Sequence, residues 1–470
     1  MKKLIFILTL VVTFSCSSDL TNMNVDTKNA VVAPGETLFS NAQKNFVDFM
    51  QSTNVNVNNF KMFAQYWTET TYTDEANYDQ GRAIPRNQWN RLYRDVLKDL
   101  KEASTNIAAD VDPLADPQIT VNKQAMIEIM NVYTYKVLVD TFGDVPYTEA
   151  LDINNVNPVY DDAATIYADL LSRLNTAIAN LDPSFDGMGN ADLYYNGSVA
   201  NWIKFGNALK LQFGVMMGDA ATVSAAAADT FTSNADNATL EYLPSTPNTN
   251  PLWVDLVQSG RSDFVVANTL VDKMAAIEVT VQDPRQAVFM DDNIVPYTGG
   301  PYGDNNSYNS YTHIGPTLED PTFAGTIFSF AETEFLKAEA VEMGLLTSGT
   351  AETYYNNGVT ASIEEWGGTA AEAADYLLQP TVAYSTAAPS WQETIGNQVW
   401  LALYGRGFAA WTQWRFLNYP TLNVAVGSGL PVPLRLTYPV VEQTLNGTNY
   451  TAASANIGGD SLDTPLFWDN

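Results

Sequence analysis

The chain has a single cysteine, Cys16, among its 470 residues. One thiol cannot form a disulfide within the chain, so the fold must be held together by the packing of its apolar residues. Hydrophobic residues make up 46% of the sequence and charged residues only 16%, which is enough apolar material for a large core. The sequence therefore predicts a globular body without covalent cross-links.

Cys16 directly follows a short apolar segment. Lys2 and Lys3 precede an uncharged run over residues 4–12, which is too short to span about 30 Å of hydrocarbon at about 1.5 Å per residue. A cationic start, an apolar run and a small residue before the cysteine are typical of a bacterial lipoprotein signal. We expect residues 1–15 to be a signal peptide and Cys16 to be lipidated; the alternative is an ordinary secreted protein with an incidental cysteine.

The rest of the chain divides into a tether and one helical domain. Residues 16–36 are polar and rich in asparagine, and we expect them to form a lipidated N-terminus and flexible tether. Over residues 37–470 helical patterns dominate. The segment 124–141 is apolar almost all round, which predicts a central buried helix. Further helices are predicted over residues 36–51, 87–105, 167–181, 198–219, 263–277, 330–345, 350–366 and 392–415.

Long irregular segments separate these helices. Residues 221–262 and 280–328, and the tail from residue 420, are rich in Asn, Asp, Gly, Pro and Thr. Loops of this length in a compact protein are usually functional. We predict a mostly α-helical fold in which helix pairs of the tetratricopeptide type form one body, and long loop insertions carry the ligand face.

The charge balance restricts the partners of the chain. With 23 basic and 53 acidic residues, the formal net charge is −30. Such a chain cannot replace the counterions of a phosphate backbone, which argues against nucleic acid. The same charge disfavours contact with an anionic membrane surface. We therefore expect contact with the membrane only through the N-terminal lipid.

Catalytic and metal-binding signatures are mostly missing. The only histidine, His313, lies in a loop without a GxSxG elbow, and the chain contains no P-loop and no GxGxxG. Zinc is disfavoured because His and Cys are scarce. The acidic clusters Asp186–Asp192 and Asp291–Asn293 could supply oxygen ligands for structural calcium, but solvated turns are the favoured interpretation. We expect no cofactor and no catalytic metal.

A glycosidase is the enzyme hypothesis that the composition leaves open. Such enzymes need only two carboxyl groups, and Glu69 together with Glu364 or Glu365 could form the pair. With 53 acidic residues, pairs of this kind arise by chance. We therefore expect the protein not to be an enzyme.

Aromatic residues in the loops are the sequence feature that indicates a ligand-binding surface. Tyrosine and tryptophan alternate there with amides and carboxylates, a combination that suits sugars, because rings stack on C–H faces and planar polar groups bind hydroxyls. The alternatives are that these rings cap the core or line a protein interface. The candidate ligand residues are Trp67, Tyr72, Asp74, Tyr78, Tyr297, Tyr302, Asn305, Tyr308 and Tyr311.

Several segments resemble signatures of the SusD/RagB family of outer-membrane lipoproteins, most of all its SusD-like branch. They occur in the order in which the family has them: FGDVPYTEAL at 142–151, WIKFGNALKLQFGVMM at 202–217, DPR at 283–285, GNQVWLALYGRGFAAWTQWRFLNYPTL at 396–422 and LPVPLRLTYPVVEQTLNGTNYTAA at 430–453. One departure is Trp414-Arg415-Phe416, where the family has a pair of arginines after the tryptophan. We interpret the FGDVP and 396–422 segments as structural and do not count their residues among the ligand residues.

The resemblance implies a function as well as a fold. Members of this family cap a TonB-dependent, SusC-like transporter in the outer membrane and have no catalytic activity. The resemblance thus implies a lipid-anchored, cell-surface protein that captures nutrient oligosaccharides for the transporter. A lid that binds peptides for a transporter of the same type is the alternative.

Overall fold

The computed structural model describes residues 33–278 and 280–469. The predicted signal peptide, Cys16 and most of the predicted tether lie outside the described residues. Residues Gly35–Asn470 form one unit with its own core. None of the helices in the described ranges combines the length and the apolar character that crossing a membrane requires.

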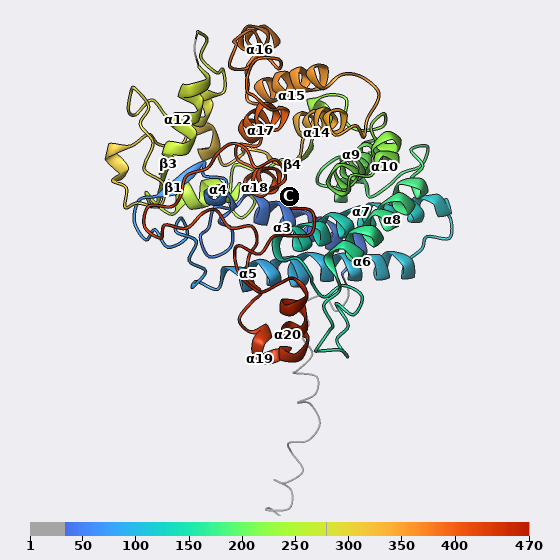
Figure 1. Cartoon of the computed structure of the whole chain (residues 1–470). Coiled ribbons are helices and arrows are strands. Elements are labelled where there is room, and N and C mark those ends of the chain that lie inside the picture. Colours follow the sequence, from blue (N-terminus) through green and yellow to red (C-terminus); the bar gives the residue numbers. More distant parts are fainter. Residues whose placement is uncertain (1–32, 279, 470) are drawn as a thin grey trace, which may run out of the picture. The chain divides into compact units, whose positions relative to one another are not determined.

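Helices make up most of the regular structure (Figure 1). The longer helices are α3 (Gly35–Gln51), α6 (Lys98–Ala109), α7 (Pro117–Phe142), α8 (Ala163–Asn180), α9 (Val199–Met217), α12 (Asn268–Ile277), α14 (Phe330–Glu342), α15 (Ala351–Glu365), α16 (Ala370–Leu377), α17 (Trp391–Ala402), α18 (Gly407–Leu417) and α20 (Gly447–Asn456). The shorter ones are α4 (Phe60–Phe63), α5 (Ile84–Asn90), η1 (Arg91–Leu97), α10 (Ala220–Ala226), α11 (Pro251–Trp253), η4 (Val254–Gln258), α13 (Gln286–Phe289) and α19 (Glu442–Leu445).

Helix α7 shows why the sequence folds in this way. The side chain of Asp116 accepts a hydrogen bond from the Gln118 amide, and Pro117 occupies the first helical position, where its missing N–H costs nothing. The helix ends at Gly143, whose φ of +83° suits glycine. Its residues are buried almost continuously from Ala125 to Phe142, which confirms the prediction of a central buried helix over 124–141.

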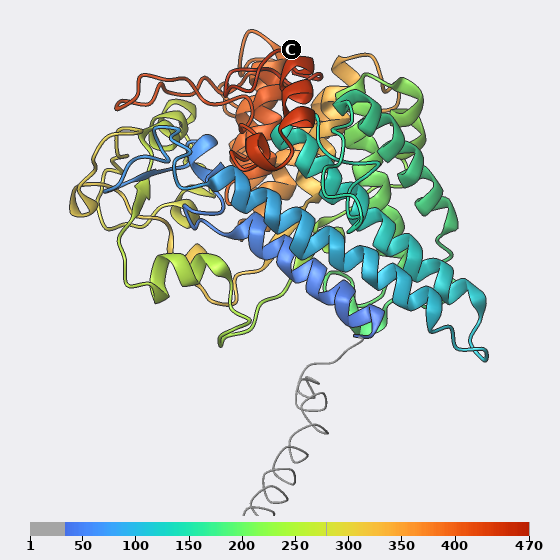
Figure 2. The same ribbon diagram turned by 90° about the horizontal axis from the view of Figure 1, so that it is seen from below.

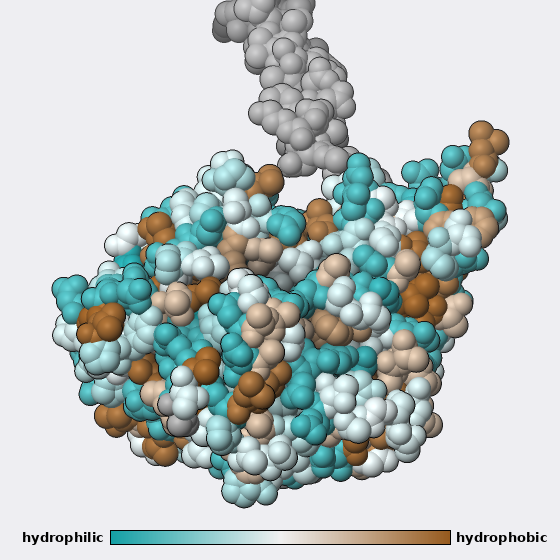
Figure 3. Space-filling model, turned by 90° about the horizontal axis from the view of Figure 1, so that it is seen from above, coloured by the Kyte–Doolittle hydropathy of each residue, from teal (hydrophilic) through white to brown (hydrophobic). Residues whose placement is uncertain are grey.

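Consecutive helices pack against each other in pairs: α7 with α8, α9 with α10, α14 with α15, and α17 with α18. Helix α3 lies alongside the continuous run of α5, η1 and α6, as Figure 2 shows. This arrangement confirms the predicted mostly α-helical fold built on tetratricopeptide-type pairs. On the face seen from above, apolar side chains lie in small groups among hydrophilic ones (Figure 3).

Two of the predicted helices are wrong in part. The helix expected over 263–277 begins only at Asn268, because Phe264–Val266 form strand β3. The helix expected over 392–415 is two helices, α17 and α18, separated by a turn at Gly405 with φ +83°. Before α12 the apolar run over residues 264–267 leads directly into the helix, so periodicity alone does not reveal the strand. The break between α17 and α18 is marked in the sequence by the two glycines of Gly405-Arg406-Gly407.

Within the described ranges, four short strands form two antiparallel pairs. Strand β1 (Trp67–Glu69) pairs with β3 (Phe264–Val266), so that Trp67 lies opposite Val266 and Glu69 opposite Phe264. Strand β2 (Ala238–Leu240) pairs with β4 (Gly325–Phe328), with a shift in register next to Ala238. The β1–β3 pair joins the segment after α4 to the segment before α12, and the β2–β4 pair joins the two long loops over 221–262 and 280–328.

The family-like segment around α18 serves packing. The Arg415 guanidinium is fully buried, lies 3.5 Å from the ring centre of Trp411 and 4.8 Å from that of Trp468, and donates to the carbonyls of Asp140 and Leu434 at 2.8 and 2.7 Å. Removal from water lowers the pKa of Arg415 to about 10. Its bonds to carbonyl oxygens compensate for the burial of the charge, which agrees with the structural interpretation of residues 396–422.

Candidate ligand-binding groove

The β1–β3 pair brings two loops together where strand β1 ends and strand β3 begins. The amide of Thr70 donates to the carbonyl of Asp263 at 2.9 Å, and the Thr70 hydroxyl donates to the carbonyl of Ser262 at 2.6 Å. These bonds continue the strand pairing by one residue, so residues 70–72 lie beside residues 261–263.

A third loop is fastened to the same place. The Val266 amide donates to the Thr312 carbonyl at 3.0 Å, and the Gly300 amide donates to the Val266 carbonyl at 2.9 Å. The buried amide of Asn306 donates to the carbonyl of Glu69 at 3.0 Å. Three segments far apart in the sequence thus meet at one edge of a two-stranded sheet.

Between them lies a surface depression that we call the Arg261 groove. It consists of two adjoining hollows, of about 260 and 450 Å³, which share Thr71, Arg261 and Asp263. The first hollow reaches Tyr72 and the second reaches Asn305 and Tyr308. The remaining lining residues are Val55, Glu69, Thr70, Arg82, Ser262, Asn306 and Ser307.

An ion pair occupies the shared part of the groove. Arg261 Nε lies 2.5 Å from Asp263 Oδ2, and Arg261 Nη2 lies 2.8 Å from Asp263 Oδ1. Such a fork-to-fork pair fixes both side chains in one plane and uses two of the five guanidinium N–H groups. The Arg261 guanidinium and the Asp263 carboxylate therefore keep a fixed orientation at the centre of the groove, where they offer planar donors and acceptors.

Three of the predicted ligand residues are brought together here: Tyr72, Asn305 and Tyr308. The Tyr72 side chain is 68% exposed and its backbone has a φ of +58°. The Tyr308 ring is half-buried and stacks on the imidazole of His313, with 3.8 Å between ring centres. One ring therefore projects from each of two loops that the sequence separates by more than two hundred residues.

The structure corrects the prediction for Trp67, Tyr78 and Tyr302, which belong to the core. Their side chains are 0%, 2% and 1% exposed. Trp67 donates its indole N–H to the Tyr404 hydroxyl at 2.9 Å, and the Tyr302 hydroxyl donates to the Met62 carbonyl at 2.8 Å. The rings of Tyr78 and Tyr302 pack against each other. All three rings are therefore enclosed by protein, and none of them lines the Arg261 groove.

The other predicted ligand residues lie outside the groove. Asp74 is exposed, with its carboxylate 3.9 Å from the Arg82 guanidinium. The Tyr297 hydroxyl donates to Asp292 at 2.6 Å, and Tyr311 is half-buried. Neither tyrosine lines either hollow, so a ligand role for these residues stays a prediction.

The polar centre of the groove was not predicted from the sequence. Arg261, Asp263, Thr70, Thr71 and Ser307 were not among the candidates. The available signal was the charged pair in RSD at 261–263, directly before the β-branched run of strand β3.

The buried carboxyl group of Glu69 lies in the wall of the first hollow, next to that of Glu75. Its Oε2 accepts from the Ala76 amide at 2.9 Å, and Glu75 forms an ion pair with Arg82. Burial, reinforced by the neighbouring Glu75, raises the pKa of Glu69 to about 9. Glu69 is thus protonated at neutral pH.

The carboxyl groups considered for glycosidase chemistry are not arranged for it. Glu365 lines a different cavity, which shares no lining residue with the groove, and Glu364 is exposed. Glu69 and these residues therefore do not face one another across a common space. Among the described residues, no three His, Cys, Asp or Glu side chains come together as a metal-ligand set.

Residues 26–439 match the model of the SusD-like family described as "Starch-binding associating with outer membrane". No curated protein matches the chain. Solved structures similar to it include a chitin-binding protein, which is 24% identical, with 93% of this chain and 99% of that chain covered and a TM-score of 0.77.

Two further structures are similar over nearly their whole length. A SusD homologue from Bacteroides uniformis is 22% identical, with 92% of this chain and 99% of that chain covered and a TM-score of 0.78. A chitin-binding SusD homologue from Flavobacterium johnsoniae is 21% identical, with 92% and 97% covered and a TM-score of 0.74. These likenesses establish the fold. Because the family model spans most of the sequence, the chain belongs to the SusD-like family of outer-membrane-associated proteins.

Proposed function

We propose that this protein captures oligosaccharides in the Arg261 groove and delivers them to a TonB-dependent transporter of the outer membrane. One observation carries the ligand part of the proposal: the two hollows of the groove lead to Tyr72 and Tyr308, and the Arg261–Asp263 pair lies in their shared centre. Aromatic faces on either side of planar polar groups suit a chain of pyranose rings.

The chemistry of the groove suits hydroxyl-rich ligands. The C–H faces of sugar rings pack on aromatic rings, here Tyr72 and Tyr308, at little cost in desolvation. The sugar hydroxyls both donate and accept, and Arg261, Asp263 and Asn305 supply groups of both kinds. The hollows are open along the surface, so a ligand longer than two sugars can extend beyond them.

The family supports a polysaccharide ligand. Its description names starch, and two of the similar structures are chitin-binding proteins. We therefore favour glycan over peptide, and a peptide ligand becomes an outcome of the test below.

We propose that the protein acts by binding alone. Two carboxyl groups line the groove: that of Asp263 is paired with Arg261, and that of Glu69 is buried, with its pKa raised to about 9. The ring of the only histidine in the sequence, His313, is stacked under Tyr308, with its Nε2 3.0 Å from the Tyr308 carbonyl. Asp263 is held by its counter-ion, Glu69 by burial and His313 by its ring stacking, so these groups serve binding rather than acid–base catalysis.

The delivery part of the proposal rests on the family and the sequence. A lipid on Cys16 and the polar tether would hold the binding body at the membrane next to its transporter. Incorporation of labelled palmitate should be abolished in Cys16→Ala, and pull-down of the lipidated protein should recover a barrel-sized membrane protein.

Calorimetry with glycan and peptide panels tests the ligand. The probes are N-acetylglucosamine oligomers, malto-oligosaccharides and oligopeptides. If the groove binds sugars, Tyr72→Ala and Tyr308→Ala should each cost about 1–3 kcal/mol, by analogy with aromatic stacking on other ligand rings. Tyr354→Ala is the matched control, since Tyr354 is also half-buried but lies on helix α15 and lines neither hollow. Binding of peptides alone, or full glycan affinity in both groove variants, would overturn the proposal.

A further inference from the structure

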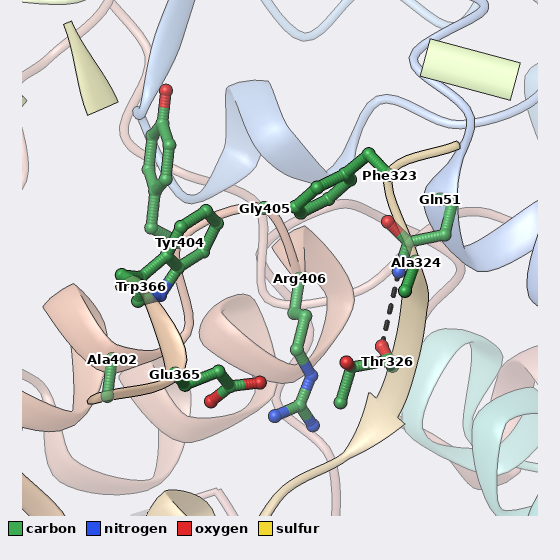
Figure 4. A pocket seen from close by; sticks show the side chains of 10 residues that line it. All are labelled: Gln51, Phe323, Ala324, Thr326, Glu365, Trp366, Ala402, Tyr404, Gly405 and Arg406. Carbon is green, nitrogen blue, oxygen red and sulfur yellow. Dashed lines mark hydrogen bonds between the residues drawn. The ribbon is translucent and has the colours of Figure 1, made fainter. Parts of the chain in front are cut away.

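A second cavity lies where helices α15 and α17 end, and its walls are aromatic. We call it the Trp366 cavity (Figure 4). Its volume is about 130 Å³, similar to cavities of about 150 Å³ that hold a benzene-sized molecule. The lining residues are Gln51, Phe323, Ala324, Thr326, Glu365, Trp366, Ala402, Tyr404, Gly405 and Arg406.

Three rings surround the indole of Trp366. The Phe323 ring stacks on it with 5.9 Å between centroids and 23° between planes, Tyr404 lies 5.6 Å away, and Phe289 meets it edge-on at 5.0 Å. Phe323 and Trp366 are half-buried, so part of each ring faces the cavity. The indole is thus held in a fixed position.

The charges around the cavity leave one acid without an ionic partner. Arg406 is neutralised by Glu332, with which it forms an ion pair, and it also donates to the Ser329 hydroxyl and the Ile327 carbonyl, both at 3.0 Å. Glu365 accepts only a long hydrogen bond of 3.4 Å from the Asn237 amide, and no ion pair joins it to a Lys or Arg of the described ranges. Figure 4 shows its carboxyl group on the same side of the cavity as the Arg406 side chain.

We propose that the Trp366 cavity binds an organic ammonium group on a short carbon stem. Ring faces attract cations through their quadrupole, and an otherwise unpaired carboxylate supplies the counter-charge. The volume admits a group the size of a lysine side chain, and an amino sugar would place only its ammonium end in it. The cavity shares no lining residue with the Arg261 groove, so this inference stands apart from the proposed function.

Glu365 gives the site a pH dependence. Burial raises the pKa of Glu365 to about 7; the nearby Arg406 opposes this rise and Glu332 adds to it. Asn237, the remaining neighbour in hydrogen-bond contact, does not titrate. An alkylammonium stays charged up to about pH 10. The counter-charge is therefore mostly absent at pH 6 and mostly present at pH 8, whereas the ligand charge is constant.

Calorimetric titration of the whole protein tests the proposal with three ammonium probes: n-pentylammonium, glucosamine and the amide of Nα-acetyl-lysine. The neutral counterparts are n-pentanol, N-acetylglucosamine and the amide of Nα-acetyl-norleucine. We expect at least one ammonium probe to bind, with an affinity about tenfold higher at pH 8 than at pH 6, as follows from a pKa near 7. The probe that binds identifies the source of the ammonium group as a free amine, an amino sugar or a peptide.

Variants distinguish binding in the Trp366 cavity from a general attraction between the cationic probes and the acidic protein. Glu365→Gln keeps the shape and the contact with Asn237, and should lower the affinity at pH 8 at least fivefold and abolish its pH dependence. Glu364→Gln, at the exposed neighbouring position, is the matched control and should change neither. Trp366→Phe tests whether the indole ring contributes to binding. It replaces larger changes at this position in case they unfold the chain. Equal binding of neutral and ammonium probes, or no binding of any ammonium probe, would overturn the proposal.

Discussion

The ring of Tyr308 lies on the ring of His313, with 3.8 Å between centroids and 20° between planes. His313 Nε2 also lies 3.0 Å from the Tyr308 carbonyl oxygen, and because a carbonyl only accepts, this nitrogen carries the hydrogen. The only histidine of the sequence therefore supports the Tyr308 ring at the edge of the groove.

This support leads to the first prediction. Replacement His313→Ala removes an aromatic pair worth about 0.5–1.5 kcal/mol, so Tyr308 should lose its fixed orientation and glycan affinity should fall roughly two- to tenfold. The melting temperature should change little, because both rings are only half-buried. His313→Phe should retain the stacking and most of the affinity. A large loss of stability in His313→Ala would show that the histidine has a folding role instead.

The second prediction contrasts two neighbouring aromatic residues, Trp67 and Tyr72. Trp67 is fully buried, so Trp67→Ala should destabilise the fold by about 3–5 kcal/mol. Tyr72 is 68% exposed, so Tyr72→Ala should alter the free energy of unfolding by no more than about 0.5 kcal/mol while weakening ligand binding. Urea denaturation of both variants measures the difference. Similar losses of stability in the two would contradict the burial seen here.

The helical body was predictable because its signals are local. The apolar pattern of α7, its Asp116 cap and its glycine stop all lie within one continuous segment. Strand β3 was missed because three residues, Phe264–Val266, continue directly into the apolar pattern of α12. A strand of this length exists only through its partner β1, and such long-range pairing leaves no periodic trace in the sequence.

The site was predictable only in outline. Aromatic and amide residues in the loops indicated a ligand surface, but the pattern does not tell an exposed ring such as Tyr72 from a buried one such as Tyr302. That distinction is made by the β1–β3 pairing, which turns Trp67 inward and sets Arg261 and Asp263 beside Thr70. The polar centre of the groove therefore emerges only in three dimensions.

The third prediction concerns the buried pair within the DPR segment. Arg285 is fully buried, and its Nε and Nη2 donate to Asp283 at 2.9 and 2.7 Å. Asp283→Asn would leave a guanidinium charge buried without its counter-ion, so we expect a loss of about 3–5 kcal/mol in the free energy of unfolding at pH 7. Arg94→Gln, which removes an exposed ion pair with Asp95, is the control and should cost little.

The pH profile of the same variant checks the cause. Burial opposes ionisation of Asp283, but the charge and hydrogen bonds of Arg285 outweigh it and hold the pKa of Asp283 below its ordinary value. A lowered pKa contributes stability above the pKa of the unfolded chain, about 3.9, and this contribution is lost as the pH falls through the folded value. The gap between the parent protein and Asp283→Asn should therefore be widest at neutral pH and shrink below about pH 4. A constant gap would mean that the asparagine acts through packing.

The fourth prediction concerns Glu69, whose pKa is raised in the folded protein, whereas that of Asp283 is lowered. Burial beside Glu75 raises the pKa of Glu69 to about 9, so the folded protein holds a proton that the unfolded chain releases above about pH 4.3. The free energy of unfolding therefore decreases as the pH rises from about 4.3 toward 9, since the folded state binds more protons. Glu69→Gln keeps an acceptor for the Ala76 amide and cannot ionise. Its melting temperature should exceed that of the parent protein by a clear margin at pH 8 and by much less at pH 4. Glu364→Gln, at an exposed position, is the control and should show no such trend. An equal effect of Glu69→Gln at both pH values would mean that Glu69 is ionised in the folded protein and does not share a proton with Glu75.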